Sequence, residues 1–188
     1  MQLFLDSTIR LIAKKPIPDI TLHDIADDAG LNHGYVFRYF GTRLDLFFAV
    51  TEELARLAEN AVSTEIEKRN SDRATILPLD LSIVALGRPF TLQRQAIIQY
   101  LVTSGVDPLR FSESSRKANV LFAQQLTTVG MSERMAMTQA TILGILLWAE
   151  NSVASIFGVT EDEKNDIQAL SFDIILNAQD AEKRLGWN

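Results

Sequence analysis

Threonines followed by an acidic residue three positions later recur along this 188-residue chain, and they restrict its fold more than any other feature. Three of these pairs stand where a helix is expected to begin, namely Thr21 with Asp24, Thr42 with Asp45, and Thr160 with Glu163. In a capping box the threonine side chain accepts a hydrogen bond from the first helical turn, and the acid bonds back to the threonine backbone. Each pair is therefore predicted to open a helix.

Apolar residues between these caps follow helical spacing throughout. No stretch shows sustained alternation of polar and apolar residues, so no strand is predicted. Gly87, Arg88 and Pro89 are predicted to interrupt the chain. The sequence thus predicts an all-α protein of about nine helices, near residues 3–14, 21–29, 32–40, 42–69, 74–86, 91–103, 108–129, 132–157 and 160–185.

The composition excludes several function classes. There is no cysteine, and the only histidines are His23 and His33, which excludes thiolate zinc sites, a cysteine nucleophile and a multi-histidine metal centre. No phosphate-binding glycine motif and no nucleophile–base pair is visible, so neither an enzyme nor a bound cofactor or metal is expected. The longest apolar run, Ile142 to Ala149, is far shorter than the roughly 20 residues that cross a bilayer. We therefore expect a cytoplasmic protein without a membrane span.

The charge balance argues against a broadly basic nucleic-acid-binding surface. The formal net charge is −6, and the first 50 residues hold five basic and six acidic side chains. Any binding to DNA would have to use a few well-placed groups.

Residues 21–40 form the most informative segment. A helix-turn-helix needs a small residue where its helices cross, a glycine in the turn, and apolar residues that lock the pair. The segment supplies such a core in Ile25, Ala26, Ala29, Gly30, Leu31, Val36 and Phe40. The second helix leaves His33, Tyr35 and Arg38 exposed, and a helix of this size fits the DNA major groove. An ordinary helical hairpin with a glycine turn would satisfy the same spacing.

This segment resembles the N-terminal DNA-binding domain of TetR-type transcriptional regulators. The matching residues are Thr21, Ile25, Ala26, Ala29, Gly30, Leu31, Asn32, Gly34, Val36, Phe37, Tyr39, Phe40 and Arg43. The resemblance covers about the first 50 residues. It implies a helix-turn-helix domain over residues 1–50 and a larger helical domain for effector binding and dimerisation over residues 51–188.

The resemblance also implies roles for individual residues. Base contacts fall on His33, Gly34 and Tyr35, with Arg38 beside them, and phosphate contacts fall on Thr21, Tyr39, Thr42 and Arg43. Helix N-termini, as at Thr21 and at Thr42 with Arg43, suit phosphates because they present backbone N–H groups and a positive dipole end. Phe37 departs from the family, which usually has tyrosine there, so one hydroxyl contact to a phosphate is absent.

The larger C-terminal part is expected to pair two chains and to take up a small molecule. Close helix packing through small residues, and an apolar stripe on the last helix, predict a dimer interface that includes Ala140, Gly144, Leu170, Ile174 and Ala178. Aromatic and methionine residues that could line an effector chamber are Phe90, Tyr100, Phe111, Phe122, Met131, Met135 and Trp148. Plain core packing explains the same residues.

Two functions follow from these features. The first is a dimeric, sequence-specific regulator, a repressor, that binds double-stranded operator DNA and leaves it when a small-molecule effector binds. The second is a helical dimer that binds a small molecule or a protein and has lost operator binding.

Overall fold

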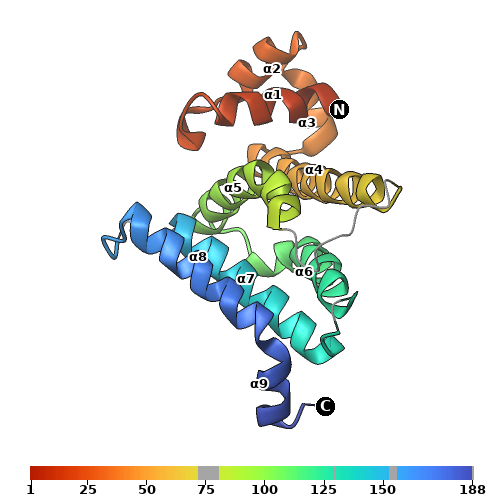
Figure 1. The fold of residues 1–188 in the computed structure, drawn as a ribbon. Coiled ribbons are helices and arrows are strands. Elements are labelled where there is room, and N and C mark those ends of the chain that lie inside the picture. The colour runs from red at the N-terminus through yellow and green to blue at the C-terminus, as the bar shows by residue number, and fades with distance from the viewer. Residues whose placement is uncertain (72–80, 129, 153–155, 188) are drawn as a thin grey trace. The chain divides into compact units, whose positions relative to one another are not determined.

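The computed structural model describes residues 1–71, 81–128, 130–152 and 156–187 (Figure 1). Within these ranges the regular structure is helical and no strand occurs, which confirms the predicted all-α class. The described residues up to Ser114 form one compact unit, and those from Ser115 onward form a second. The first unit extends past residue 50, and the functional boundary placed there from the sequence stays a prediction.

The first unit brings the N-terminal helices together with two longer ones. Its described elements are α1 (Gln2–Ile12), η1 (Ile17–Asp19), α2 (Leu22–Ala29), α3 (Gly34–Phe40), α4 (Arg43–Ser71), α5 (Leu81–Thr103) and η2 (Pro108–Phe111). Figure 1 shows α1, α2 and α3 as a group at the N-terminal end. Among the described elements, α4 and α5 make the most extensive contact, and η1 lies against α5.

One hydrophobic core holds this unit together. Phe4 of α1, Ile25 of α2, Val36 of α3 and Phe47 of α4 are buried in the same cluster. Burying each such side chain contributes roughly 1.5–3 kcal/mol before entropy is subtracted. Because all four elements share this core, α2 and α3 are fixed in place on α1 and α4.

The break predicted at residues 87–89 is wrong, because α5 is one continuous helix with Pro89 inside it. Proline removes one helical hydrogen bond, which on its own favours a break. The packing of α5 on α4 opposes this: a Cβ at Gly87 would lie 3.5 Å from the backbone oxygen of Ala58, so the two helices approach closely there. The hydroxyl of Thr91 also donates to the Gly87 carbonyl oxygen at 3.1 Å. Residues 74–80, where an earlier helix was predicted, lie outside the described residues.

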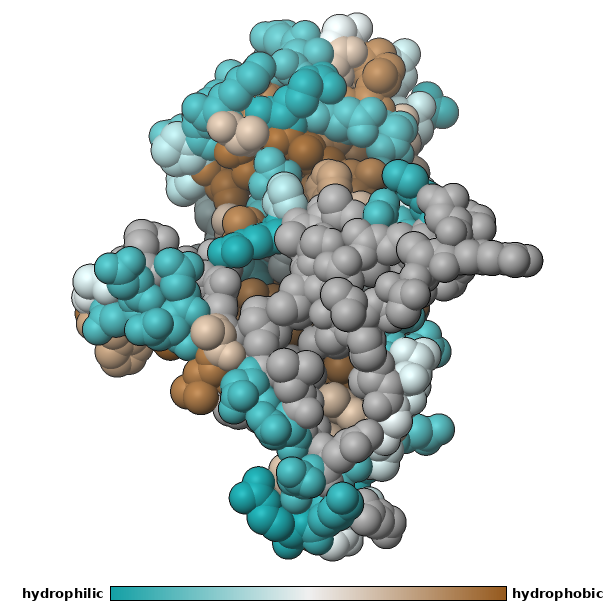
Figure 2. Space-filling view, viewed as in Figure 1, coloured by the Kyte–Doolittle hydropathy of each residue, from teal (hydrophilic) through white to brown (hydrophobic). Residues whose placement is uncertain are grey.

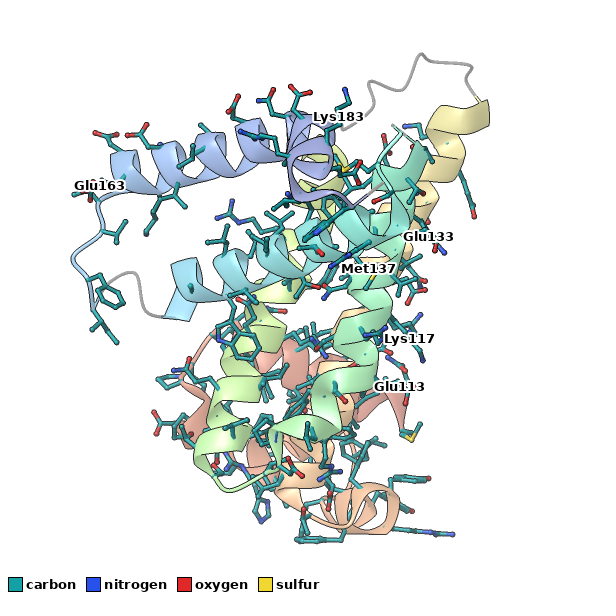
Figure 3. All side chains as sticks on the ribbon, turned by 90° about the horizontal axis from the view of Figure 1, so that it is seen from below. Glu113, Lys117, Glu133, Met137, Glu163 and Lys183 are labelled. Carbon is teal, nitrogen blue, oxygen red and sulfur yellow. The ribbon has the colours of Figure 1, made fainter. Side chains whose placement is uncertain are left out.

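The second unit contains most of α6 (Ser112–Thr128), with α7 (Glu133–Ser152), α8 (Glu161–Leu176) and α9 (Ala178–Leu185). α7 contacts α8, and α8 contacts α9. A smaller hydrophobic cluster joins Leu126 of α6 to Met135 and Ala136 of α7. Figure 3 shows Glu163 in the first turn of α8, where it completes the capping box predicted with Thr160.

The continuous final helix predicted over residues 160–185 is divided in the structure. α8 ends at Leu176, α9 begins at Ala178, and Asn177 between them has φ −97° and ψ 12°. The Asn177 side chain donates to the Asp173 carbonyl oxygen at 2.9 Å, a local bond that competes with helix continuation. α9 is held by the Glu182 carboxylate, which accepts from the Ser132 backbone N–H at 3.0 Å and from its hydroxyl. Two predicted helices thus form the single helix α5, and one predicted helix is divided into α8 and α9. The described residues therefore contain nine α-helices, the number predicted.

No helix in the described ranges has the length and apolarity needed to cross a membrane.

Candidate nucleic-acid interface

The start of α2 is fixed by the predicted capping box. The Thr21 hydroxyl accepts from the Asp24 backbone N–H at 3.1 Å, and the Asp24 carboxylate accepts from the Thr21 backbone N–H at 2.7 Å. The Lys15 ammonium lies 2.7 Å from the same carboxylate. Hydrogen bonds from Lys15 and Thr21 hold the pKa of Asp24 well below its ordinary value.

A glycine turn joins α2 to α3, as predicted. Gly30 has φ +65°, the left-handed conformation that residues with a Cβ rarely adopt. The backbone N–H of Leu31 donates to the Ala26 carbonyl oxygen at 2.9 Å and closes the end of α2. The Asn32 side chain then accepts from the Gly34 N–H at 2.8 Å at the start of α3. Local side-chain and backbone bonds therefore set the angle at which α3 leaves α2.

The residues predicted to lock the helix pair point into the core. Ile25, Ala26 and Val36 are buried, whereas Ala29, Leu31 and Phe40 are partly buried against the same cluster. The ring of Phe40 meets Phe4 edge to face, with 6.3 Å between their centroids. The two helices of the pair thus pack against α1 as well as against each other.

The opposite side of α3 is exposed and aromatic. Tyr35 is 44%, Phe37 55% and Tyr39 51% exposed, although large apolar rings are normally buried. Tyr35 and Tyr39 stack at 6.2 Å between centroids, and His33, Gly34 and Arg38 are exposed beside them. Every predicted base-contacting residue therefore lies on an exposed part of α3 or its N-terminus.

His23 and His33 form a pair across the turn that the sequence did not reveal. Their rings lie 4.5 Å apart with an interplanar angle of 37°, and both residues are exposed. The sequence did not predict this pair, because no local spacing relates positions 23 and 33. The pair extends the exposed aromatic surface from α3 towards the start of α2.

Some of the acidic residues around this surface are locally compensated. Asp28 pairs with Arg10 at 2.6 Å, and this guanidinium holds the pKa of Asp28 below its ordinary value. Asp45 accepts from the Thr42 hydroxyl at 2.7 Å and lies 3.7 Å from Arg110. Figure 2 shows hydrophilic residues covering much of the N-terminal helices in this view. The total charge of residues 1–50 therefore includes acids that are already paired with cations.

Thr42 and Arg43 open α4, but their side chains are placed differently. Thr42 is exposed and caps the helix, because its hydroxyl accepts from the Asp45 backbone N–H at 3.1 Å. The Arg43 guanidinium instead bonds to acceptors of the protein itself, on η1, on the residue after it and on Tyr100. The family resemblance implies a guanidinium that is available to bind a phosphate, whereas this guanidinium is engaged in hydrogen bonds within the protein.

The predicted chamber residues divide between the two units. Phe90, Tyr100 and Phe111 belong to the first core, where Phe111 is buried and its ring lies 5.5 Å from that of Phe48. Phe122, Met131 and Met135 belong to the second cluster, and Trp148 is exposed. The predicted chamber stays a prediction.

The predicted interface residues also differ among themselves. Ala140 is buried in the second cluster, and a Cβ at Gly144 would lie 3.4 Å from the Asn119 side chain of α6. These small residues therefore let helices of one chain pack closely. Leu170 is 63% exposed. The side chains of Ile174 and Ala178 lie outside the described part of the structure.

In the described residues, no group of three or more histidine, aspartate or glutamate side chains could hold a metal ion.

Comparison with known proteins identifies the segment that contains this surface. Residues 4–50 match the family model described as bacterial regulatory proteins, tetR family. No curated protein matches the chain in sequence. The matched residues include all of α1, α2 and α3 except the first two residues of α1 and end within α4.

Proposed function

Because the chain is a DNA-binding transcriptional regulator of the tetR family, we propose that it is a dimeric, cytoplasmic repressor that a small molecule releases from operator DNA. The exposed, aromatic side of α3 within the matched segment is the observation that carries this proposal. Residues 1–50 would bind DNA, and residues 51–188 would pair the chains and take up the effector.

The exposed residues of α3 and its N-terminus would read the bases. His33 and Arg38 supply polar groups for base edges in the major groove, while Tyr35 offers a hydroxyl and a ring. Gly34 allows the backbone at the start of α3 to approach a base closely, because it has no side chain. The buried side of the helix, through Val36, holds these groups on a rigid support.

Helix ends would hold the phosphates on either side. Thr21 and Thr42 lie at the N-termini of α2 and α4, where the helix dipole favours an anion. Tyr39, stacked on Tyr35, adds an exposed hydroxyl. These contacts would orient α3, and the base contacts would supply sequence preference.

Pairing would use the apolar surface of α7 and α8. Ile142, Ile145 and Trp148 are exposed at intervals of three residues along α7, and Leu170 is exposed on α8. Two helices from each of two chains can bury such surfaces in a four-helix bundle. One short recognition helix gives little affinity, so a dimer that contacts two half-sites suits the small surface of α3.

The effector would act by shifting a conformational equilibrium. A small molecule that binds more tightly to a form with a different spacing of the two recognition helices stabilises that form, which no longer fits both half-sites. This part of the proposal is supported by the family resemblance.

Selection of duplexes from a random pool by the full-length protein tests the proposal. We expect an inverted repeat whose half-sites lie about one helical turn, or 10–10.5 base pairs, apart or a multiple of that. Enrichment of a single, non-repeated site would contradict the dimeric mode. No enrichment over the starting pool would contradict sequence-specific binding.

A further inference from the structure

Arg43, at the first position of α4, makes an unusually complete set of contacts within the protein. Its Nε donates to the Ile20 carbonyl oxygen at 2.9 Å, and its Nη2 donates to those of Ile17 at 2.7 Å and Pro18 at 3.3 Å. Its Nη1 donates to the Tyr100 hydroxyl at 2.5 Å. Four of the five N–H directions of a guanidinium are therefore used.

Aromatic rings fix the plane of the same guanidinium. Its central carbon lies 4.8 Å from the centroid of Phe47 and 5.4 Å from that of Tyr100. These two rings meet each other edge to face at 5.8 Å. A guanidinium held over two rings and by four hydrogen bonds has little freedom to turn towards a phosphate.

The acceptors show what this arrangement does. Ile17, Pro18 and Ile20 belong to η1 and the residue after it, directly before the Thr21 cap of α2. Tyr100 lies in the last turn of α5. Arg43 thus joins three elements, namely the segment that leads into the helix-turn-helix, the start of α4 and the end of α5.

We propose that Arg43 is a positioning residue that fixes the entry to α2 against α4 and α5, and that it acts on DNA binding through this placement and not through a phosphate. A displacement of Tyr100 would then alter the segment at residues 17–20 and, through the Thr21 cap, the orientation of α2. The part of this inference that concerns DNA rests on the proposed function.

Two substitutions that preserve charge separate positioning from phosphate binding. Arg43→Lys keeps a cation that can bind a phosphate but cannot reach the same set of acceptors, because an ammonium lacks the planar fork of arginine. Tyr100→Phe removes only the hydroxyl that accepts from Arg43 and keeps the ring beside Phe47. Neither change alters the net charge.

The first measurement is amide hydrogen exchange in the DNA-free, full-length protein, read by peptide. We expect exchange over residues 17–24 to be about tenfold faster in each single variant than in the parent. The double variant should exchange no faster than either single variant, because both changes remove the same charge-assisted bond. Arg38→Lys, which changes an exposed arginine of α3, is the matched control and should leave this segment unchanged. Unchanged exchange in both Arg43→Lys and Tyr100→Phe, or faster exchange spread evenly over the chain, would overturn the proposal.

The second measurement is affinity for a selected duplex. If Arg43 acts by positioning, Arg43→Lys and Tyr100→Phe should each weaken binding by about tenfold. The double variant should bind no more weakly than either single variant, and the slope of the salt dependence should stay that of the parent. Full affinity in both single variants would overturn the role in DNA binding and favour a phosphate contact. If the parent protein bound no duplex, the proposed function would fail, while the exchange measurement would still decide the placement of residues 17–24.

Discussion

Tyr35 places a ring and a hydroxyl on the exposed side of α3, beside Tyr39 and one position before buried Val36. Its backbone is held by the core, so in the proposed complex its side chain would approach a duplex in a defined direction. A residue that reads a base contributes to sequence preference, whereas a phosphate contact weakens all sequences alike when lost.

We predict that Tyr35→Ala weakens binding to the preferred duplex by about 1–3 kcal/mol and relaxes the preference at one position of each half-site. Binding to a panel of single-base variants of that duplex measures both effects. Tyr35→Phe, which keeps the ring, shows whether the hydroxyl is responsible. An unchanged order of preference across the panel would remove Tyr35 from the base-reading residues.

The turn between α2 and α3 depends on one backbone conformation. A Cβ at Gly30 would meet nothing within 4 Å, so the only penalty for a side chain there is its φ of +65°. We predict that Gly30→Ala lowers the free energy of unfolding by about 1–2 kcal/mol. Chemical denaturation measures this, and Gly30→Asn should lose less because asparagine tolerates this conformation. Equal losses for alanine and asparagine would contradict the argument.

The cap of α2 makes a second prediction, about pH. Because the pKa of Asp24 is lowered in the folded protein, its contribution to stability is complete above the unfolded value near 4 and is lost as the pH falls further. Asp24→Asn should therefore destabilise the protein at pH 7, and the difference from the parent should shrink steadily below about pH 4. Thermal unfolding followed at several pH values tests this, and a difference that grew on acidification would have the wrong sign.

These elements also show what the sequence can predict. The capping boxes at Thr21 and Thr160, the side-chain cap at Thr42 and the turn at Gly30 were predictable because the interacting groups lie within a few residues of each other. The continuation of α5 through Pro89 was not predictable, because it depends on the close packing of α5 on α4. The family match covers the residues to which the family resemblance assigns DNA contacts, and those roles stay predictions.

The contacts of Arg43 show the same limit at the candidate site. They join positions 17–20, 43 and 100, and no local spacing relates residues so far apart in the chain. The same is true of the pair formed by His23 and His33. The sequence therefore predicted which side of α3 is exposed but not how its supporting residues are held.

The proposed dimer predicts that a charge on the apolar surface of α8 separates the two chains. Leu170→Glu should raise the dimer dissociation constant by roughly 100-fold or more, because an unpaired charge buried in an apolar interface costs several kcal/mol. Light scattering over a concentration series measures this. Leu109→Glu, at an exposed leucine of η2, is the matched control and should leave the dimer intact. A dimer that persisted in Leu170→Glu would place the interface elsewhere.

The proposed function requires that residues 1–50, whose basic and acidic side chains nearly balance, bind a DNA duplex through the exposed side of α3. Its most direct test is a salt titration of binding between the full-length protein and the DNA upstream of its own gene. We expect tight binding at low salt and a logarithm of affinity that falls linearly and steeply with the logarithm of salt concentration. Negligible binding at low salt, with no dependence on salt concentration, would contradict it and favour a helical dimer that does not bind an operator.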